Sequence, residues 1–158
     1  MSIARSLRRL SLALLWALPA LAAAQGIQRV APEHIAHYWL QTGTHLDVNL
    51  PYTGVNLSKP GCVAVSFVIG SNGQPLDVRA VRVVPPSDLG QAAVSMIQSM
   101  RFAPAPGNAV QQPIATYLMV PFNLPDLKAG MDATQRRQVM ALREAHLRPC
   151  VLPGYGSN

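Results

Sequence analysis

Charged and aromatic side chains are scarce in this chain of 158 residues. Asp, Glu, Lys and Arg together make up 13% of it and the aromatic residues 6%, whereas hydrophobic residues reach 49%. This composition excludes an intrinsically disordered protein, because disordered chains combine low hydrophobicity with high charge. The length suits one domain. The formal charge is +6, but after residue 24 the cations lie singly apart from Arg136-Arg137. We therefore expect no nucleic-acid partner.

Residue patterns typical of catalysis are also missing. No serine lies in a nucleophile-elbow sequence, and no glycine-rich loop of the phosphate-binding kind occurs. His34 and His37 have a spacing that can hold zinc and His45 lies nearby, but only Glu33 could join them as a ligand. We interpret these histidines as solvent-facing or interfacial. The sequence thus predicts a protein that is not an enzyme and has no cofactor, no metal and no small-molecule substrate.

The first 24 residues have the pattern of a secretory signal peptide. A start with three arginines precedes an apolar run over 10–21, and three alanines at 22–24 supply the small residues that a signal peptidase needs. The run is shorter than the about 20 residues of a membrane-spanning helix. We expect cleavage after residue 24 and export. The alternative is an uncleaved membrane anchor.

Only two cysteines occur, Cys62 and Cys150, and they are far apart in the sequence. A redox pair usually has a C-x-x-C spacing, which is absent here. Because an even number of cysteines in an exported chain favours a disulfide, we interpret Cys62 and Cys150 as a structural pair. The alternative is two thiols that do not pair.

Residues 61–84, GCVAVSFVIGSNGQPLDVRAVRVV, predict a β-hairpin. Asn72-Gly73 suits a two-residue type I′ turn. Counting outward from that turn pairs apolar residues on one face: Ile69 with Leu76, Phe67 with Val78, and Val65 with Ala80. On the wetter face the same count pairs Val68 with Asp77 and Ser66 with Arg79. A slip of one residue would mix apolar with polar side chains, so the pattern defines the register.

A helix and a third strand follow the hairpin. Pro85-Pro86 ends the second strand and Ser87 is a candidate helix cap. The helix carries one apolar stripe, made of Leu89, Ala92, Ala93, Met96, Ile97 and Met100. Residues 113–124 alternate as a strand does, and Pro121, which has no amide hydrogen, places that strand at a sheet edge.

Two further helices are expected to flank this unit. The spacing of Ile35, Tyr38 and Trp39 favours a short helix within 30–43, and residues 44–61 are expected to form a loop. A last helix begins near Asp132, which with Gln135 resembles a capping box. Its inner side is only weakly marked, by Val139, Leu142 and His146.

These elements predict an α+β fold of the order β-β-α-β with one packed helix. Antiparallel neighbours are favoured, so the three-stranded antiparallel sheet should have the strand order 2-1-3, with the third strand at an open edge. The expected organisation is a signal peptide at 1–24, an N-terminal helix and loop at 25–60, a core domain at 61–125, and a C-terminal helix and tail at 126–158.

This arrangement resembles the C-terminal domain of TonB-family energy transducers. The resemblance rests on the hairpin segment, the helix LGQAAVSMIQSM, the segment RFAPAP and the strand PIATYLMVPFNL. It implies a periplasmic binding module, linked to TonB-dependent transport, that recognises an extended peptide segment of an outer-membrane receptor or another envelope partner. The implied contact is strand addition to the last strand.

The expected partner-binding residues lie on that last strand, and those facing away from the helix should flank an added strand. They are Ala115, Thr116, Tyr117, Met119, Pro121 and Asn123. One alternative is a self-associating structural or assembly protein of the cell envelope, in which the open edge makes a homodimer. Another is a short transducer anchored in the inner membrane and facing the periplasm, if residues 1–24 are retained.

Overall fold

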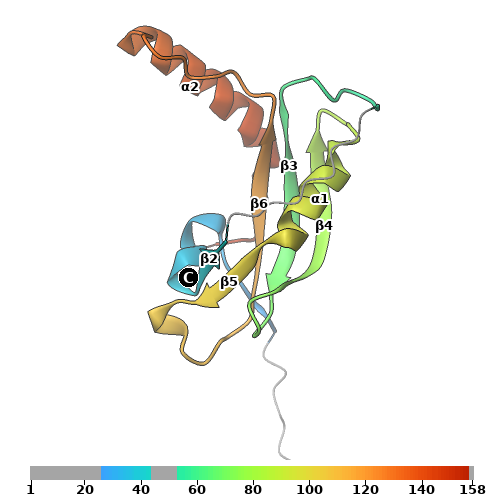
Figure 1. Ribbon diagram of the computed structural model, residues 1–158, viewed down its shortest axis with the longest axis vertical. Helices are drawn as coiled ribbons and strands as arrows, with labels where there is room; N and C mark the ends of the chain where they lie inside the picture. Colours follow the sequence, from blue (N-terminus) through green and yellow to red (C-terminus); the bar gives the residue numbers. More distant parts are fainter. Residues whose placement is uncertain (1–25, 44–52, 157–158) are drawn as a thin grey trace, which may run out of the picture.

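The computed structural model describes residues 26–43 and 53–156, which form two sheets and two longer helices (Figure 1). The expected signal peptide and His45 lie outside these residues. No described helix combines the length and the apolarity needed to traverse a bilayer. The elements in chain order are β1 (Gln28–Arg29), η1 (Pro32–His37), β2 (Trp39–Thr42), β3 (Gly61–Ile69), β4 (Pro75–Val84), α1 (Leu89–Ser99), β5 (Arg101–Pro104), η2 (Pro106–Asn108), β6 (Ile114–Phe122), α2 (Ala133–Leu147) and η3 (Arg148–Cys150).

The larger sheet has four strands in the order β1-β6-β3-β4. β3 lies between β4 and β6 and is antiparallel to both. The expected count of three strands is wrong, because β1 adds a fourth strand, parallel to β6 and on the side of β6 away from β3. β1 consists of Gln28 and Arg29 alone, and so short a polar segment carries no strand periodicity in the sequence.

The hairpin turn between β3 and β4 is longer than the expected two residues. Gly70 N donates to Gln74 O at 3.0 Å and closes the turn outside Asn72-Gly73. Ile69 therefore pairs with Pro75, and the expected pairing with Leu76 is wrong by one residue.

A bulge at Asp77 restores the register. Asp77 has a φ of 52°, the left-handed conformation that a bulge residue adopts, and the pairing of β3 with β4 is interrupted there. Beyond it, Ser66 pairs with Arg79 and Val65 with Ala80, as expected. The longer turn and the extra residue thus cancel each other at Ser66 and Val65, but a second register shift follows, so that Ala64 pairs with Arg82.

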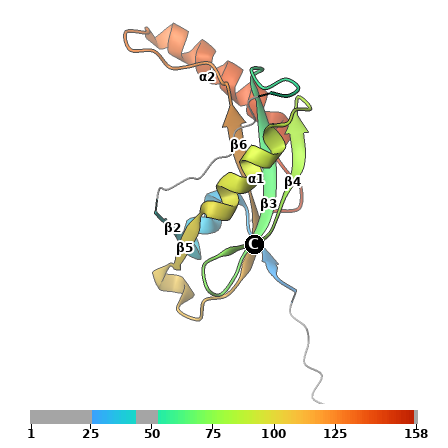
Figure 2. The same cartoon turned by 45° about the vertical axis from the view of Figure 1, so that its right-hand side comes forward.

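The helix α1 covers one face of the sheet (Figure 2). Its apolar stripe is confirmed by the burial of its side chains. The expected cap is wrong: the N-cap is Asp88 rather than Ser87, and a carboxylate oxygen of Asp88 accepts a hydrogen bond from Val55 N at 2.8 Å. That bond ties the loop before β3 to the start of the helix. The buried side chains of α1 are Leu89, Ala92, Ala93 and Ile97.

Residues 30–43 do not form the expected α-helix. They form the 3-10 helix η1 and then the strand β2, which pairs antiparallel with β5 in a second, two-stranded sheet. A spacing of i, i+3, i+4 over so few residues is met equally by a 3-10 turn that runs into a strand. The segment RFAPAP after α1, for which no strand was expected, begins with β5.

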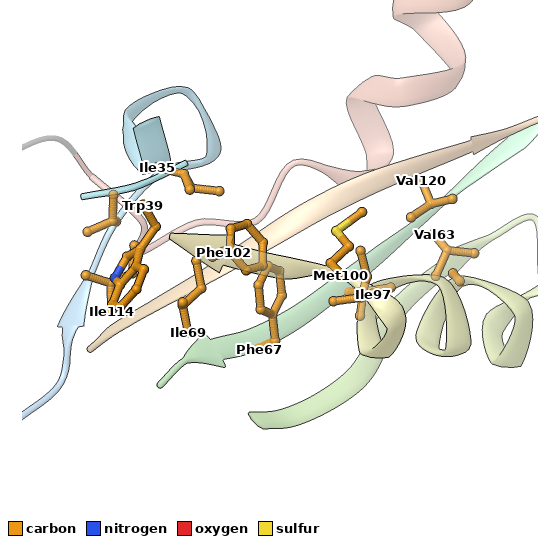
Figure 3. Packing of buried hydrophobic residues seen from close by; sticks show 13 residues of the cluster. Ile35, Trp39, Val63, Phe67, Ile69, Ile97, Met100, Phe102, Ile114 and Val120 are labelled. Carbon is orange, nitrogen blue, oxygen red and sulfur yellow. The ribbon is translucent and has the colours of Figure 1, made fainter. Parts of the chain in front are cut away.

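This second sheet closes one end of the core (Figure 3). Trp39 is 1% exposed, and its indole N–H donates to Gln112 O at 3.0 Å. The hairpin turn docks on the same sheet, because Phe102 N donates to Gly73 O at 2.9 Å. The core therefore includes residues of the N-terminal segment as well as those of the hairpin, α1 and β6.

The capping box of the last helix is confirmed. A carboxylate oxygen of Asp132 accepts from Thr134 N at 2.7 Å and from Gln135 N at 2.8 Å, and the side chain of Gln135 accepts from Asp132 N at 3.0 Å. These bonds satisfy amide groups that the first helical turn leaves without intrahelical partners.

The helix α2 itself packs loosely and projects beyond the end of β6 (Figures 1 and 2). None of its side chains is buried. Leu142, expected on the inner side, is 53% exposed, so that expectation is wrong. The half-buried side chains are Val139, Arg143, His146 and Leu147.

Candidate functional site: the outer edge of β6

The two sides of β6 can be assigned from its main-chain hydrogen bonds. Ala115 O accepts from Val30 N at 2.9 Å, so the main-chain groups of Ala115 point away from β3. Alternate residues of a strand direct their N–H and C=O groups to the same side. Tyr117, Met119 and Pro121 therefore also point away from β3. Pro121 has no amide hydrogen to donate and fits only on this outer side.

The chain itself occupies the first part of this edge. β1 pairs with Ile114 and Ala115, and the hydroxyl of Thr116 donates to Val30 O at 2.8 Å. Thr116 is fully buried. The expectation of an edge open along its whole length is thus wrong at Ala115 and Thr116, because residues far away in the sequence cover them.

The second part of the edge carries main-chain groups that are free for a partner. Within 26–43 and 53–156, no main-chain partner contacts the outward groups of Tyr117, Met119 and Pro121. These groups are two amides and three carbonyls, spaced along one line. An extended peptide laid beside β6 could bond to each of them.

The side chain of Tyr117 faces away from α1, as expected, but is covered by the chain. Tyr117 is 4% exposed, and its ring centroid lies 4.9 Å from that of Tyr155. The guanidinium of Arg29 in turn lies 5.9 Å from the centroid of the Tyr155 ring. Tyr117 can therefore offer a partner its main-chain groups but little of its side chain.

Asn123, the last of the expected partner-binding residues, ends the strand. It has a φ of 50°, and its side-chain amide donates to Leu57 O at 2.7 Å and to Lys59 O at 3.2 Å. The structure places it as the contact between the end of β6 and the loop before β3. Of the expected residues, Ala115 and Thr116 are covered by the chain. Tyr117, Met119 and Pro121 have outward main-chain groups without a main-chain partner in the described residues, and Asn123 contacts the loop before β3.

The expected disulfide between Cys62 and Cys150 is confirmed. Their Cα atoms lie 6.2 Å apart, and the bond joins residues separated by 88 positions. Both are buried in a second cluster on the face of the sheet opposite α1. Arg82 also donates to Pro149 O at 2.8 Å. These contacts hold the segment after α2 under the central strand.

The two described histidines that the sequence singled out, His34 and His37, lie together on η1. The rings of His34 and His37 lie 5.4 Å apart on η1, and the described residues contain no group of three metal-ligating side chains. The strongest feature that the sequence did not reveal is β1, whose Gln28 and Arg29 reach the same edge as the expected partner.

Comparison with known proteins finds one family model that matches part of the chain. Residues 51–124 match the model described as Gram-negative bacterial TonB protein C-terminal. The solution NMR structure of Pseudomonas aeruginosa TonB CTD is similar over 57% of this chain and 90% of that chain, with 18% sequence identity and a TM-score of 0.41. No curated protein matches the chain. Residues 51–124, which contain the hairpin, α1 and β6, are thus similar to the TonB C-terminal family, and the resemblance expected from the sequence is confirmed over this part of the chain.

Proposed function

We propose that this protein is a periplasmic binding module that pairs an extended segment of an outer-membrane receptor, or of another envelope protein, with the outer edge of β6. One observation carries the proposal. The main-chain groups of Tyr117, Met119 and Pro121 point away from β3 and have no main-chain partner within the described residues. A row of such groups is a template for an added strand.

The match to the TonB C-terminal family model supports this proposal. TonB C-terminal domains are periplasmic energy-transducing or binding modules that interact with outer-membrane receptors. The edge of β6 lies within the matched residues 51–124, whereas β1, α2 and the disulfide partner Cys150 lie outside them. The proposed binding edge thus belongs to the family domain, and the elements around it belong to the rest of this chain.

The expected affinity of the edge alone is low. Five main-chain groups can form about five hydrogen bonds, each contributing about 1 kcal/mol net. The sum of about 5 kcal/mol corresponds to a Kd between about 0.1 and 1 mM, before the loss of peptide entropy is counted. A partner that binds in the micromolar range needs further contacts.

Crosslinking in the producing cells tests the proposal. A photoreactive amino acid is placed at Met119 and, as a matched control, at the exposed Arg79 on the opposite edge strand β4. We expect Met119 to capture an outer-membrane receptor or envelope protein and Arg79 to capture little. Capture from Arg79 alone would contradict the proposal, and capture of a second copy from Met119 would favour the homodimer instead.

We further propose that residues 1–24 are removed and that the protein acts without its own membrane anchor. The pattern of three arginines, an apolar run and three alanines supports cleavage. Mass spectrometry of the protein from the cell envelope tests it. A chain that begins at residue 25 is expected, whereas a retained Met1 in the membrane fraction would favour the anchored transducer.

A further inference from the structure

A groove of about 840 Å³ lies between α2 and the second half of β6. The larger apolar side chains of its lining are Met119, Met140, Leu147 and Val151. Met140 and Val151 are each 51% exposed, so this apolar surface is open to solvent. Because Met119 belongs both to the groove and to the free edge of β6, the groove begins beside the main-chain groups of the proposed site.

The lining of the groove is also positively charged. It carries Arg136, Arg137, Arg143 and Arg148 against one acid, Glu144, a net charge of 4 − 1 = +3. Arg148 pairs with Glu144 at 3.4 Å, and Arg143 donates to Pro125 O at 2.8 Å. Over the residues that the structure describes, Arg136 and Arg137 have no carboxylate within 4.0 Å.

We propose that this groove binds an acidic, apolar stretch that flanks the paired residues in the same partner segment. Apolar side chains of the partner would cover Met119 and Met140, and its carboxylates would pair with Arg136 and Arg137. Arginine suits this contact, because its guanidinium can bind a carboxylate through two parallel hydrogen bonds. The inference rests on the proposed function and supplies the contacts that the edge alone lacks.

Charge and position favour such a peptide over the other occupants. A second copy of this chain placed symmetrically on the groove would bring its own lining charge of +3 against the first, and like charges across an interface repel each other. A lipid surface could pair with the arginines of the groove. It would not explain why the groove adjoins the free edge of β6, to which Met119 also belongs.

The test uses chains 25–158 and a displayed library of random 16-residue peptides as the probe. We expect selected peptides to be enriched in Asp or Glu together with apolar residues toward one end. The double variant Arg136→Glu/Arg137→Glu should bind synthetic copies of them about tenfold more weakly, since two favourable pairs become two repulsive ones. Glutamates near the start of α2 suit the helix dipole, so the variant should keep its fold.

A matched control variant, Arg79→Glu/Arg101→Glu, reverses the same number of charges on β4 and β5 and should bind as the original protein does. The variant Met119→Pro removes an outward amide of the edge together with a side chain of the groove, whereas Arg136→Glu/Arg137→Glu leaves the edge intact. Comparing the two variants therefore separates the two proposals. The groove proposal alone would be overturned if the selected peptides show no acidic enrichment, bind Arg136→Glu/Arg137→Glu as tightly as the original protein, and fail to bind Met119→Pro. If the selected peptides bind Met119→Pro as tightly as the original protein, or if the library yields no binder, both the groove proposal and the proposed function are overturned.

Discussion

Removal of the disulfide should destabilise the protein by about 3–5 kcal/mol. The bond joins Cys62 and Cys150 across a separation of 88 residues. In the chain-entropy model, a closed loop of that length reduces the freedom of the unfolded chain by an amount equivalent to about 4.5 kcal/mol at 25 °C. A domain of this size typically has only 5–15 kcal/mol of stability in total. The double variant Cys62→Ala/Cys150→Ala should therefore lose a large part of it.

Urea unfolding provides the assay. Trp39 is the one tryptophan after residue 24, and it is buried in the core, so its fluorescence reports unfolding of the folded domain. The free energy of unfolding in water is obtained by linear extrapolation for the oxidised protein and for the double variant. As a control, dithiothreitol should lower the free energy of unfolding of the original protein to that of the double variant, and it should leave the free energy of unfolding of the variant unchanged. A loss below about 1 kcal/mol, or a variant that still responds to the reductant, would refute the reasoning.

Three further predictions, with four substitutions in all, test the turns, the core and the cap of α2. Gly73→Ala should destabilise the protein by more than about 2 kcal/mol in the same urea titration, because Gly73 has a φ of +72° and a new Cβ there would collide with Phe102 O. Gly130→Ala is the control: its φ is +84° but the space around it is open, so this variant should be destabilised by only about 1 kcal/mol. Asn108→Ala should lower the free energy of unfolding by about 2–3 kcal/mol, because this buried side chain forms hydrogen bonds to two segments of the core. Thermal unfolding measures the effect, and an unchanged melting temperature would contradict the prediction. Asp132→Ala should weaken α2 by about 1 kcal/mol through loss of its capping box, seen as faster amide exchange confined to the first turns of α2.

Local patterns accounted for the parts of the fold that depend on neighbours in the sequence. The alternation in the hairpin and the stripe of α1 follow from burial on one face, and the capping box follows from two side chains three residues apart. The bulge at Asp77 could not be predicted, because it follows a turn that is longer than Asn72-Gly73 alone indicates and that bonds to the distant residue Phe102. Leu142 was misplaced because α2 buries too little for its periodicity to matter.

The candidate site was predictable to a similar degree. Pro121 and the alternation of β6 indicated which side of the strand faces outward, since a residue without an amide hydrogen is tolerated only at an edge. The cover over Ala115 and Tyr117 was not predictable, because it comes from Arg29 and Tyr155, which lie at the two ends of the described chain and carry no pattern that indicates a sheet contact.

The most direct test of the strand-addition proposal is an NMR titration of the isotope-labelled chain 25–158 with a peptide covering the segment that the crosslinking identifies. We expect amide shifts to concentrate at residues 117–122, together with slowed hydrogen exchange of the amides of Tyr117 and Met119 as they become bonded. The variant Met119→Pro should remain folded and bind the peptide more weakly. If the shifts cluster on α1 or around His34 and His37 and leave β6 unmoved, strand addition to this edge is wrong.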